Sequence, residues 1–104
     1  MLVDTQPAMS AATRLAICHA VNTRGAYPSW IDMGRRVASM RDRRAAREAR
    51  SWFDHWFPKG SAARGDMRND YGARAIGLAD RTYGNIDWIE VARSAAEDAA
   101  EVVA

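Results

Sequence analysis

The feature that most constrains the fold is a two-sided pattern with helical spacing in the middle of the chain. At about 100° per residue, residues 38–56 place alanines and tryptophans on one side of a helix. These are Ala38, Ala45, Ala49, Trp52 and Trp56. The nearly opposite side carries charged residues: Arg36, Arg43, Arg47, Arg50 and Asp54. No segment alternates apolar and polar residues as a half-buried strand does. The sequence therefore predicts an all-α fold, a compact bundle of four or five helices.

Capping residues and glycines predict where the first helices begin and end. Ser10 is expected to cap a helix over residues 11–24, which Gly25 would end in a left-handed conformation. The spacing of Ser29 and Asp32 resembles a capping box, so a second helix is expected to begin at Ser29. The expected apolar side of the first helix consists of Leu15, Ile17, Cys18 and Val21.

The apolar face of the second helix changes direction near residue 40. Met33, Val37 and Met40 do not lie on the Ala/Trp side of residues 38–56. Ser39 and Asp42 repeat the capping spacing at this point. Two alternatives follow: either one helix bends, or one helix ends and another begins, as a helix-turn-helix requires.

His55 and four aromatic residues lie close to the end of this helical region, and the second histidine, His19, belongs to the first expected helix. Trp52 and Trp56 are expected in the core, whereas Phe53 and Phe57 either join the core or cover a loop or another chain. The histidines, His19 and His55, are expected to be structural, because neither has a second metal ligand at helical spacing. No metal or other cofactor is expected.

The second half of the chain is predicted from its glycines and one proline. Pro58 ends the helix before it, and residues 58–69 are expected to form a loop. Residues 70–81 are weakly helical because of two internal glycines. Asn85 is expected to cap a last helix, whose apolar stripe is Trp88, Val91, Ala92, Ala95, Ala99 and Val102. Residues 1–104 are thus read as a single domain with a flexible N-terminus over residues 1–9.

Charge is distributed unevenly along the chain, although the net charge is only +2. Residues 35–50 hold seven arginines against Asp42 and Glu48, and residues 85–104 hold five acids against Arg93. The two segments could serve different partners, or they could face each other within the fold. The acidic segment favours self-association or a basic protein, so a homo-oligomer is possible.

The arginine-rich side is the first candidate functional surface, formed by Arg36, Arg43, Arg47 and Arg50. Guanidinium groups at this spacing can neutralise phosphates of a nucleic acid, or they can dock an acidic protein. No asparagine or glutamine accompanies them, so recognition of bases would depend on arginine alone. A merely solvated helix face is the alternative.

The second candidate is a possible polar site of His19, Asp66, Asn69, Asp70 and Arg74. Short polar side chains beside loop glycines often gather at functional sites. The same residues are also explained by a capped helix start, with Asp70 and Arg74 paired four residues apart. An enzyme would need a general base, and the candidates are His19, His55, Asp66 and Asp70. No catalytic residue is assigned.

Residues 65–77, "GDMRNDYGARAIG", contain the spacing Asp-x-x-Asn-Asp-x-x-x-Arg-x-Ile-Gly. This spacing resembles the "D-x-x-N-N-x-x-G-R-x-I-G" signature of a helical bacterial domain of uncharacterised function, found in phage-associated and toxin-like proteins. Asp70 and Ala73 stand where that signature has asparagine and glycine, and its upstream "R-H-A-x-W" segment is matched only by His19 and Ala20. The resemblance implies a bacterial or phage source and brings no established reaction.

Cysteine usage and hydropathy bear on location. Cys18 is the one cysteine, which fits a reducing compartment. The N-terminal segment has no basic stretch followed by an apolar run, and no window approaches 18 consecutive apolar residues. A cytoplasmic protein without membrane contact is expected. The predicted function is that of a small accessory protein that binds a macromolecular partner. The alternative is a toxin-like or hydrolase-like enzyme centred on residues 66–74.

Overall fold

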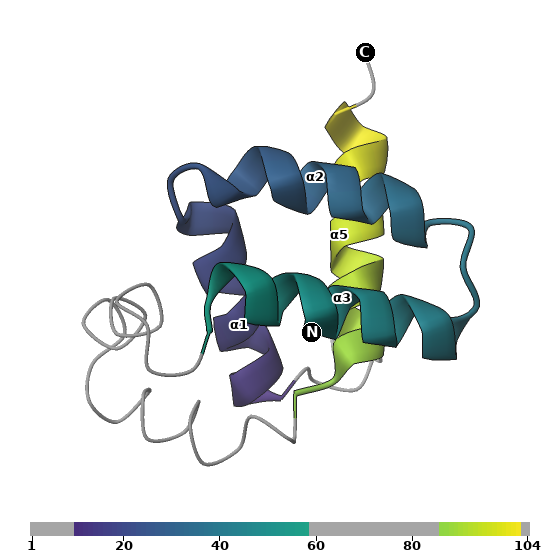
Figure 1. Ribbon diagram of the computed structural model, residues 1–104, viewed down its shortest axis with the longest axis horizontal. Coiled ribbons are helices and arrows are strands. Elements are labelled where there is room, and N and C mark those ends of the chain that lie inside the picture. The colour runs from purple at the N-terminus through teal and green to yellow at the C-terminus, as the bar shows by residue number, and fades with distance from the viewer. Residues whose placement is uncertain (1–9, 59–85, 103–104) are drawn as a thin grey trace, which may run out of the picture.

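The computed structural model describes residues 10–58 and 86–102, and within these ranges it contains four α-helices and no strand (Figure 1). The helices are α1 (Ala11–Asn22), α2 (Ala26–Val37), α3 (Asp42–Trp56) and α5 (Trp88–Val102). The predicted all-α fold is therefore confirmed. The flexible N-terminus over residues 1–9, the loop after Pro58 and the helix over residues 70–81 lie outside the described residues.

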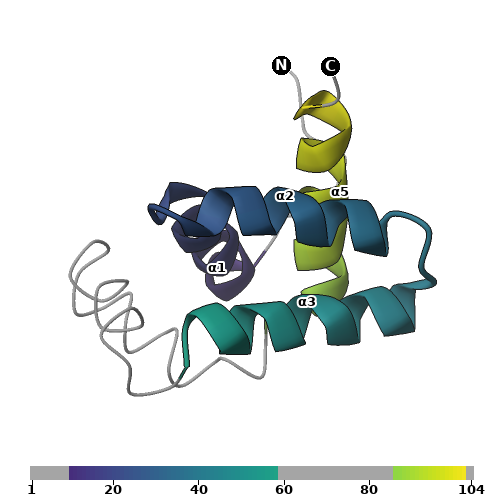
Figure 2. The same ribbon diagram turned by 45° about the horizontal axis from the view of Figure 1, so that its top comes forward.

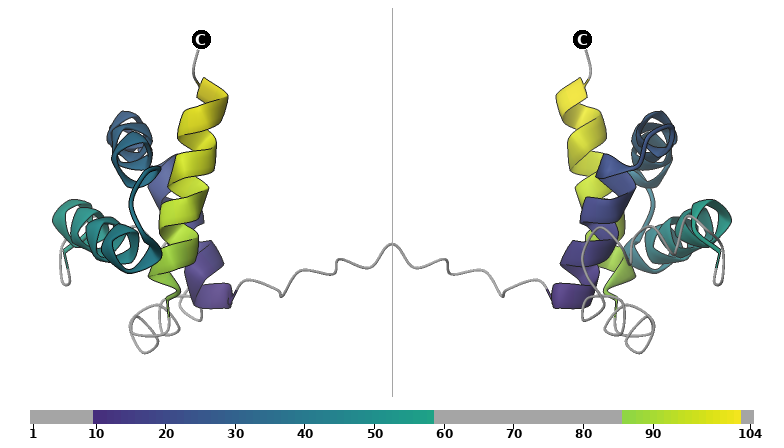
Figure 3. Two further views of the ribbon diagram at one scale, coloured as in Figure 1. Left: turned by 90° about the vertical axis from the view of Figure 1, so that its right-hand side faces the viewer. Right: turned by 90° about the vertical axis from the view of Figure 1, so that its left-hand side faces the viewer.

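The helices form two layers. α2 and α3 run antiparallel in one layer, and α1 and α5 cross behind them in the other (Figures 1 and 2). The side views show the same division, with α2 and α3 on one side of α5 (Figure 3). α5 contacts the three other helices, and its contact with α2 is the most extensive. The core lies between the two layers, where α5 meets the antiparallel pair.

The break predicted near residue 40 separates two helices. α2 ends at Val37 and α3 begins at Asp42. Because α2 and α3 run antiparallel, they differ from the steep crossing of a helix-turn-helix. Ala38 lies in the connection and is exposed, so its predicted place on the Ala/Trp face was wrong. Ser39 does not cap α3, since the N-cap residue is Arg41, which makes no side-chain capping hydrogen bond.

The predicted start of α2 was three residues too late. Gly25, at φ 87°, precedes the first residue of α2, and the Ala26 N–H donates to the Thr23 carbonyl at 3.1 Å. A residue with positive φ turns the chain sharply from α1 into α2 without any side-chain cap. Pro28 falls in the first turn of α2, where its missing N–H would have no intrahelical partner in any case.

The starts of α1 and α5 are joined through Thr13. The Ser10 hydroxyl caps α1 as predicted, accepting from the Thr13 N–H at 3.1 Å. The Thr13 hydroxyl, fully buried, accepts from the Asp87 N–H at 2.8 Å and also bonds Ser10. The start predicted for the last helix was too early, because Asp87 caps it: its Oδ1 accepts from the N–H groups of Ile89 and Glu90.

The buried side of α1 was predicted incorrectly. It consists of small and polar residues: Ala12, Thr13, Ala16, His19 and Ala20. The larger apolar residues that were expected there are only half-buried: Leu15, Ile17, Cys18 and Val21. The hydrogen bond from Asp87 fixes Thr13 on the inner side, and this fixes which face of α1 is buried.

The aromatic residues of α3 mostly enter the core. Trp52, Phe53 and Phe57 are buried, and Trp56 is half-buried against them. The core alternative for Phe53 and Phe57 is therefore confirmed. On α5, the predicted stripe is buried from Trp88 to Ala99, whereas Val102 is exposed where the helix extends past α2 (Figure 1).

α2 and α5 approach most closely at Gly34. A Cβ atom added there would meet the carbonyl carbon of Ala95 at 2.5 Å and the Cβ atom of Ala99 at 3.1 Å. One turn earlier on α2, the buried Trp30 donates from its indole Nε1 to Asp98 Oδ2 at 2.8 Å. The crossing thus combines close backbone packing with one hydrogen bond between side chains.

Replacing Gly34 with alanine is expected to destabilise the protein by about 1–3 kcal/mol, because the added methyl group overpacks this crossing. The sign of the stability change distinguishes overpacking from helix propensity, because replacing glycine with alanine in an exposed helix stabilises it by about 1 kcal/mol. Thermal unfolding followed by circular dichroism measures the difference. A Gly34→Ala protein as stable as the unchanged protein would contradict the close approach.

Candidate functional site

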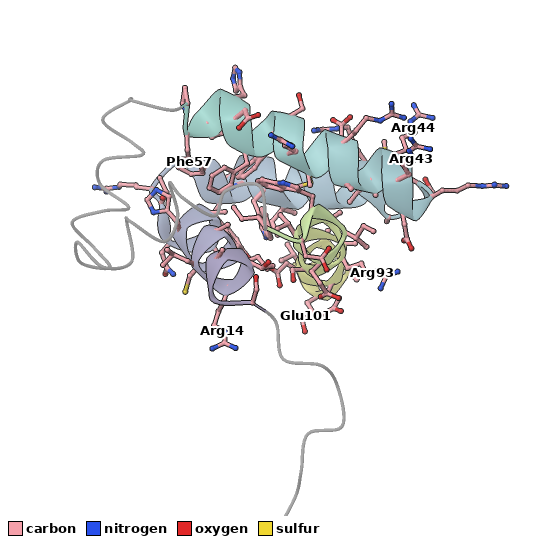
Figure 4. All side chains as sticks on the ribbon, turned by 90° about the horizontal axis from the view of Figure 1, so that it is seen from below. Arg14, Arg43, Arg44, Phe57, Arg93 and Glu101 are labelled. Atoms are coloured by element: carbon pink, nitrogen blue, oxygen red, sulfur yellow. The ribbon has the colours of Figure 1, made fainter. Side chains whose placement is uncertain are left out.

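The outer side of α3 carries a group of exposed arginines that we call the basic face: Arg43, Arg44, Arg47 and Arg50. Arg43 and Arg44 project away from the helices (Figure 4). Arg43, Arg47 and Arg50 lie opposite the buried side of α3, as the helical spacing predicted, and Arg44 lies to one side of them. Arg36, which was expected on the same stripe, is exposed but belongs to α2.

The acids within residues 35–50 are engaged by arginines from other helices. Glu48 accepts from Arg36 of α2 at 3.2 Å, and Asp42 accepts from Arg93 of α5 at 2.9 Å. No ion pair within residues 10–58 and 86–102 includes the other arginines near the start of α3: Arg41, Arg43, Arg44 and Arg47. The basic face therefore keeps positive charge that the neighbouring acids do not neutralise.

The basic segment (residues 35–50) and the acidic segment (residues 85–104) do not neutralise each other where α3 contacts α5. The ion pair between α3 and α5 joins Asp42, an acid of the basic segment, to Arg93, the one arginine of the acidic segment. Asp87 and Asp98 are engaged with N–H donors, at the start of α5 and at Trp30. The excess positive charge on α3 and the excess negative charge on α5 both remain at the surface.

The positive charges at the start of α3 destabilise this helix. Arg41 is the N-cap residue, and Arg43 and Arg44 lie in the first turn, near the positive end of the helix dipole. Arg43 and Arg47 are four residues apart, a spacing at which like charges destabilise a helix. The basic face is therefore not explained as a contribution to the stability of α3.

Replacing Arg43 and Arg47 with glutamine is expected to stabilise the protein at low salt. Relief of a like-charge pair contributes about 0.2–0.5 kcal/mol, which corresponds to about 1–4 °C in the melting temperature of a domain of this size. The gain should disappear near 1 M salt, where the Debye length is about 3 Å. The matched control is Arg14→Gln with Arg24→Gln on and after α1. A double variant at Arg43 and Arg47 that melts lower at low salt would contradict the argument.

The inner side of α3 is fixed to α2 by Ser29. Its Oγ accepts from Nε1 of Trp52 at 2.9 Å and from Nε1 of Trp56 at 3.1 Å. Trp52 also meets Trp30 edge to face, with ring centroids 5.5 Å apart. Ser29 had been predicted as a helix cap, and its bonds to two tryptophans had no signal in the sequence. These contacts set the rotation of α3 and hence the direction of its basic face.

Replacing Ser29 with alanine removes the acceptor of two indole N–H groups, so we expect a loss of about 1–3 kcal/mol in the free energy of unfolding. The exposed Ser51 of α3 offers a control, and Ser51→Ala should stay within about 0.5 kcal/mol of the unchanged protein. Trp52→Ala should cost about 3–5 kcal/mol. Equal stability of the two serine variants in urea unfolding would show that the shared acceptor is unimportant.

The second candidate site is only partly within the described residues. His19 is buried, and its ring lies 4.6 Å from that of Phe57. The other members of the possible polar site lie outside the described residues: Asp66, Asn69, Asp70 and Arg74. His55 is exposed, with its ring 6.4 Å from that of Trp56. The described part of the chain places His19 in the core packing of α1 and α3.

No group of three or more His, Cys, Asp or Glu side chains that could hold a metal ion occurs within residues 10–58 and 86–102. None of the helices described there has the length and apolar character needed to cross a membrane.

Comparisons with models of protein families, with curated proteins and with solved structures found no match to this chain. The resemblance of residues 65–77 to a helical domain of phage-associated and toxin-like proteins therefore stays a prediction.

Proposed function

We propose that this protein is a small accessory protein that binds an acidic macromolecule on the basic face of α3. The observation that carries the proposal is a set of arginines at the start of α3, exposed and outside the ion pairs of the described residues, at positions unfavourable to the helix. An acidic partner would supply the missing counter-charge. Arg36 lies next to this surface through its bond to Glu48 and extends it onto α2.

The chemistry of the basic face suits contacts to charge rather than to particular bases. α3 has no asparagine or glutamine, and its aromatic residues lie on or beside the buried side. Guanidinium groups alone can pair with phosphates of a nucleic acid or with carboxylates of an acidic protein. A cytoplasmic location is part of the proposal, since Cys18 is a free thiol.

Duplex DNA provides the first test, because phosphate contacts give a defined salt dependence. Binding through four phosphates should weaken with salt at a log–log slope near about −3.6. Replacing Arg43 and Arg47 with glutamine should reduce the magnitude of that slope by about 1.8, which is two phosphates. The control pair, Arg14→Gln with Arg24→Gln, removes the same charge elsewhere and should leave the slope nearly unchanged. Fluorescence anisotropy at several salt concentrations measures all three proteins.

The second probe is poly-L-glutamate, which presents carboxylates instead of phosphates. Binding to poly-L-glutamate but not to duplex DNA or single-stranded RNA would identify an acidic protein as the partner. Binding that is equally strong in the double variant at Arg43 and Arg47 would move the site away from α3. A protein that binds none of the three probes at low salt would overturn the proposed function.

A further inference from the structure

The exposed side of α5 carries three glutamates at helical spacing, which we call the acidic stripe: Glu90, Glu97 and Glu101. They fall within about 40° of one another around the helix and lie opposite the buried Trp88 and Ala99. Glu97 and Glu101 are exposed, and Glu90 is half-buried. No ion pair of the described residues includes any of the three. α5 therefore presents carboxylates that no ion pair of the described residues engages.

The acidic stripe and the basic face have matching dimensions. Glu97 and Glu101 are four residues apart, as are Arg43 and Arg47, which is about 6 Å along each helix. Glu90 and Glu97 are seven residues apart, like Arg43 and Arg50, which is about 10 Å. Two helices laid side by side can thus align two carboxylates with two guanidinium groups in one register, Glu97 and Glu101 with Arg43 and Arg47.

The two surfaces cannot meet within one molecule. Each faces away from the core on its own helix, and the contact between α3 and α5 is already made by their buried sides and by Arg93 with Asp42. Arg43 and Arg44 lie on a different side of the protein from Glu101 (Figure 4). The last turns of α5 extend past α2, so the end of the acidic stripe is accessible to another molecule (Figure 1).

We propose that the basic face of one molecule docks on the acidic stripe of a second copy of this chain. The inference rests on the proposed function, because it names the acidic macromolecule that the arginines bind. Since the two surfaces lie on different sides of the molecule, the contact is head-to-tail, and an open chain of copies keeps one free surface of each kind. Association should therefore be weakened by salt and should continue beyond a dimer as the concentration rises.

Sedimentation velocity at about 50 mM and about 0.5 M salt measures the association, which should be lost at the higher salt. Arg43→Gln with Arg47→Gln, and Glu97→Gln with Glu101→Gln, should each weaken it by about tenfold or more, because each removes one side of the contact. Arg14→Gln with Arg24→Gln is the control and should associate normally. Circular dichroism and thermal unfolding confirm that each variant is folded.

Charge reversal gives the decisive test of the contact between the two surfaces. Arg43→Glu with Arg47→Glu cancels the net positive charge of the basic face, and Glu97→Arg with Glu101→Arg makes the acidic stripe net positive, so each variant alone should be monomeric. Mixing the two variants restores complementary surfaces and should restore association. If a reversed variant does not fold, the glutamine variants carry the same test.

The outcomes separate this inference from the proposed function. The protein could stay monomeric at low salt and still bind duplex DNA or poly-L-glutamate through Arg43 and Arg47. That result would overturn the inference that the partner is a second copy, and it would support the proposed function. Association that survives Glu97→Gln with Glu101→Gln, or a mixture of reversed variants that stays monomeric, would overturn the inference as well. Loss of association in both glutamine variants, with recovery in the mixture, would support it.

Discussion

The close crossing of α2 and α5 at Gly34 is the constraint on which the other contacts depend. Only a residue without a side chain lets the carbonyl group of Ala95 lie against α2, and the bond from Trp30 to Asp98 fixes the same crossing one turn away. With α5 held there, its start reaches Thr13 of α1 and its Arg93 reaches Asp42 of α3. The remaining helices are therefore positioned relative to α5, although α5 comes last in the sequence.

Seven acids of the described residues fall into two groups, one that stabilises the fold and one that contributes surface charge. Asp42, Glu48 and Asp98 each accept a hydrogen bond from another helix, and Asp87 caps the start of α5, so all four contribute to the architecture. The glutamates of α5 have no ion pair in the described structure and point away from the core. Because the structural acids engage Arg36 and Arg93, they leave the arginines at the start of α3 without a counter-charge. The surface charge therefore follows from how the helices pack.

Local periodicity predicted α3 well, because its Ala/Trp side and its arginine side are both encoded within a few turns. The same reasoning failed where a tertiary contact decides. The start of α2 depends on the positive φ of Gly25, and Ser29 is used by two tryptophans from another helix. The buried face of α1 is decided by the bond to Asp87, more than 70 residues away in the sequence. At the candidate site, the exposure of the arginines was predictable, but the partners of Arg36 and Arg93 were not, since they require the packed fold.

The stabilising contacts of α3 and its proposed binding surface lie on opposite sides of the helix. The inner side is held by buried aromatic rings and by the hydrogen bonds to Ser29, none of which involves a charged group of the basic face. The outer side contributes like charges that oppose helix formation and gain from any acidic partner. A helix held from within can tolerate this unfavourable surface charge without unfolding. Under the proposed function, an acidic partner would also relieve the repulsion between these arginines.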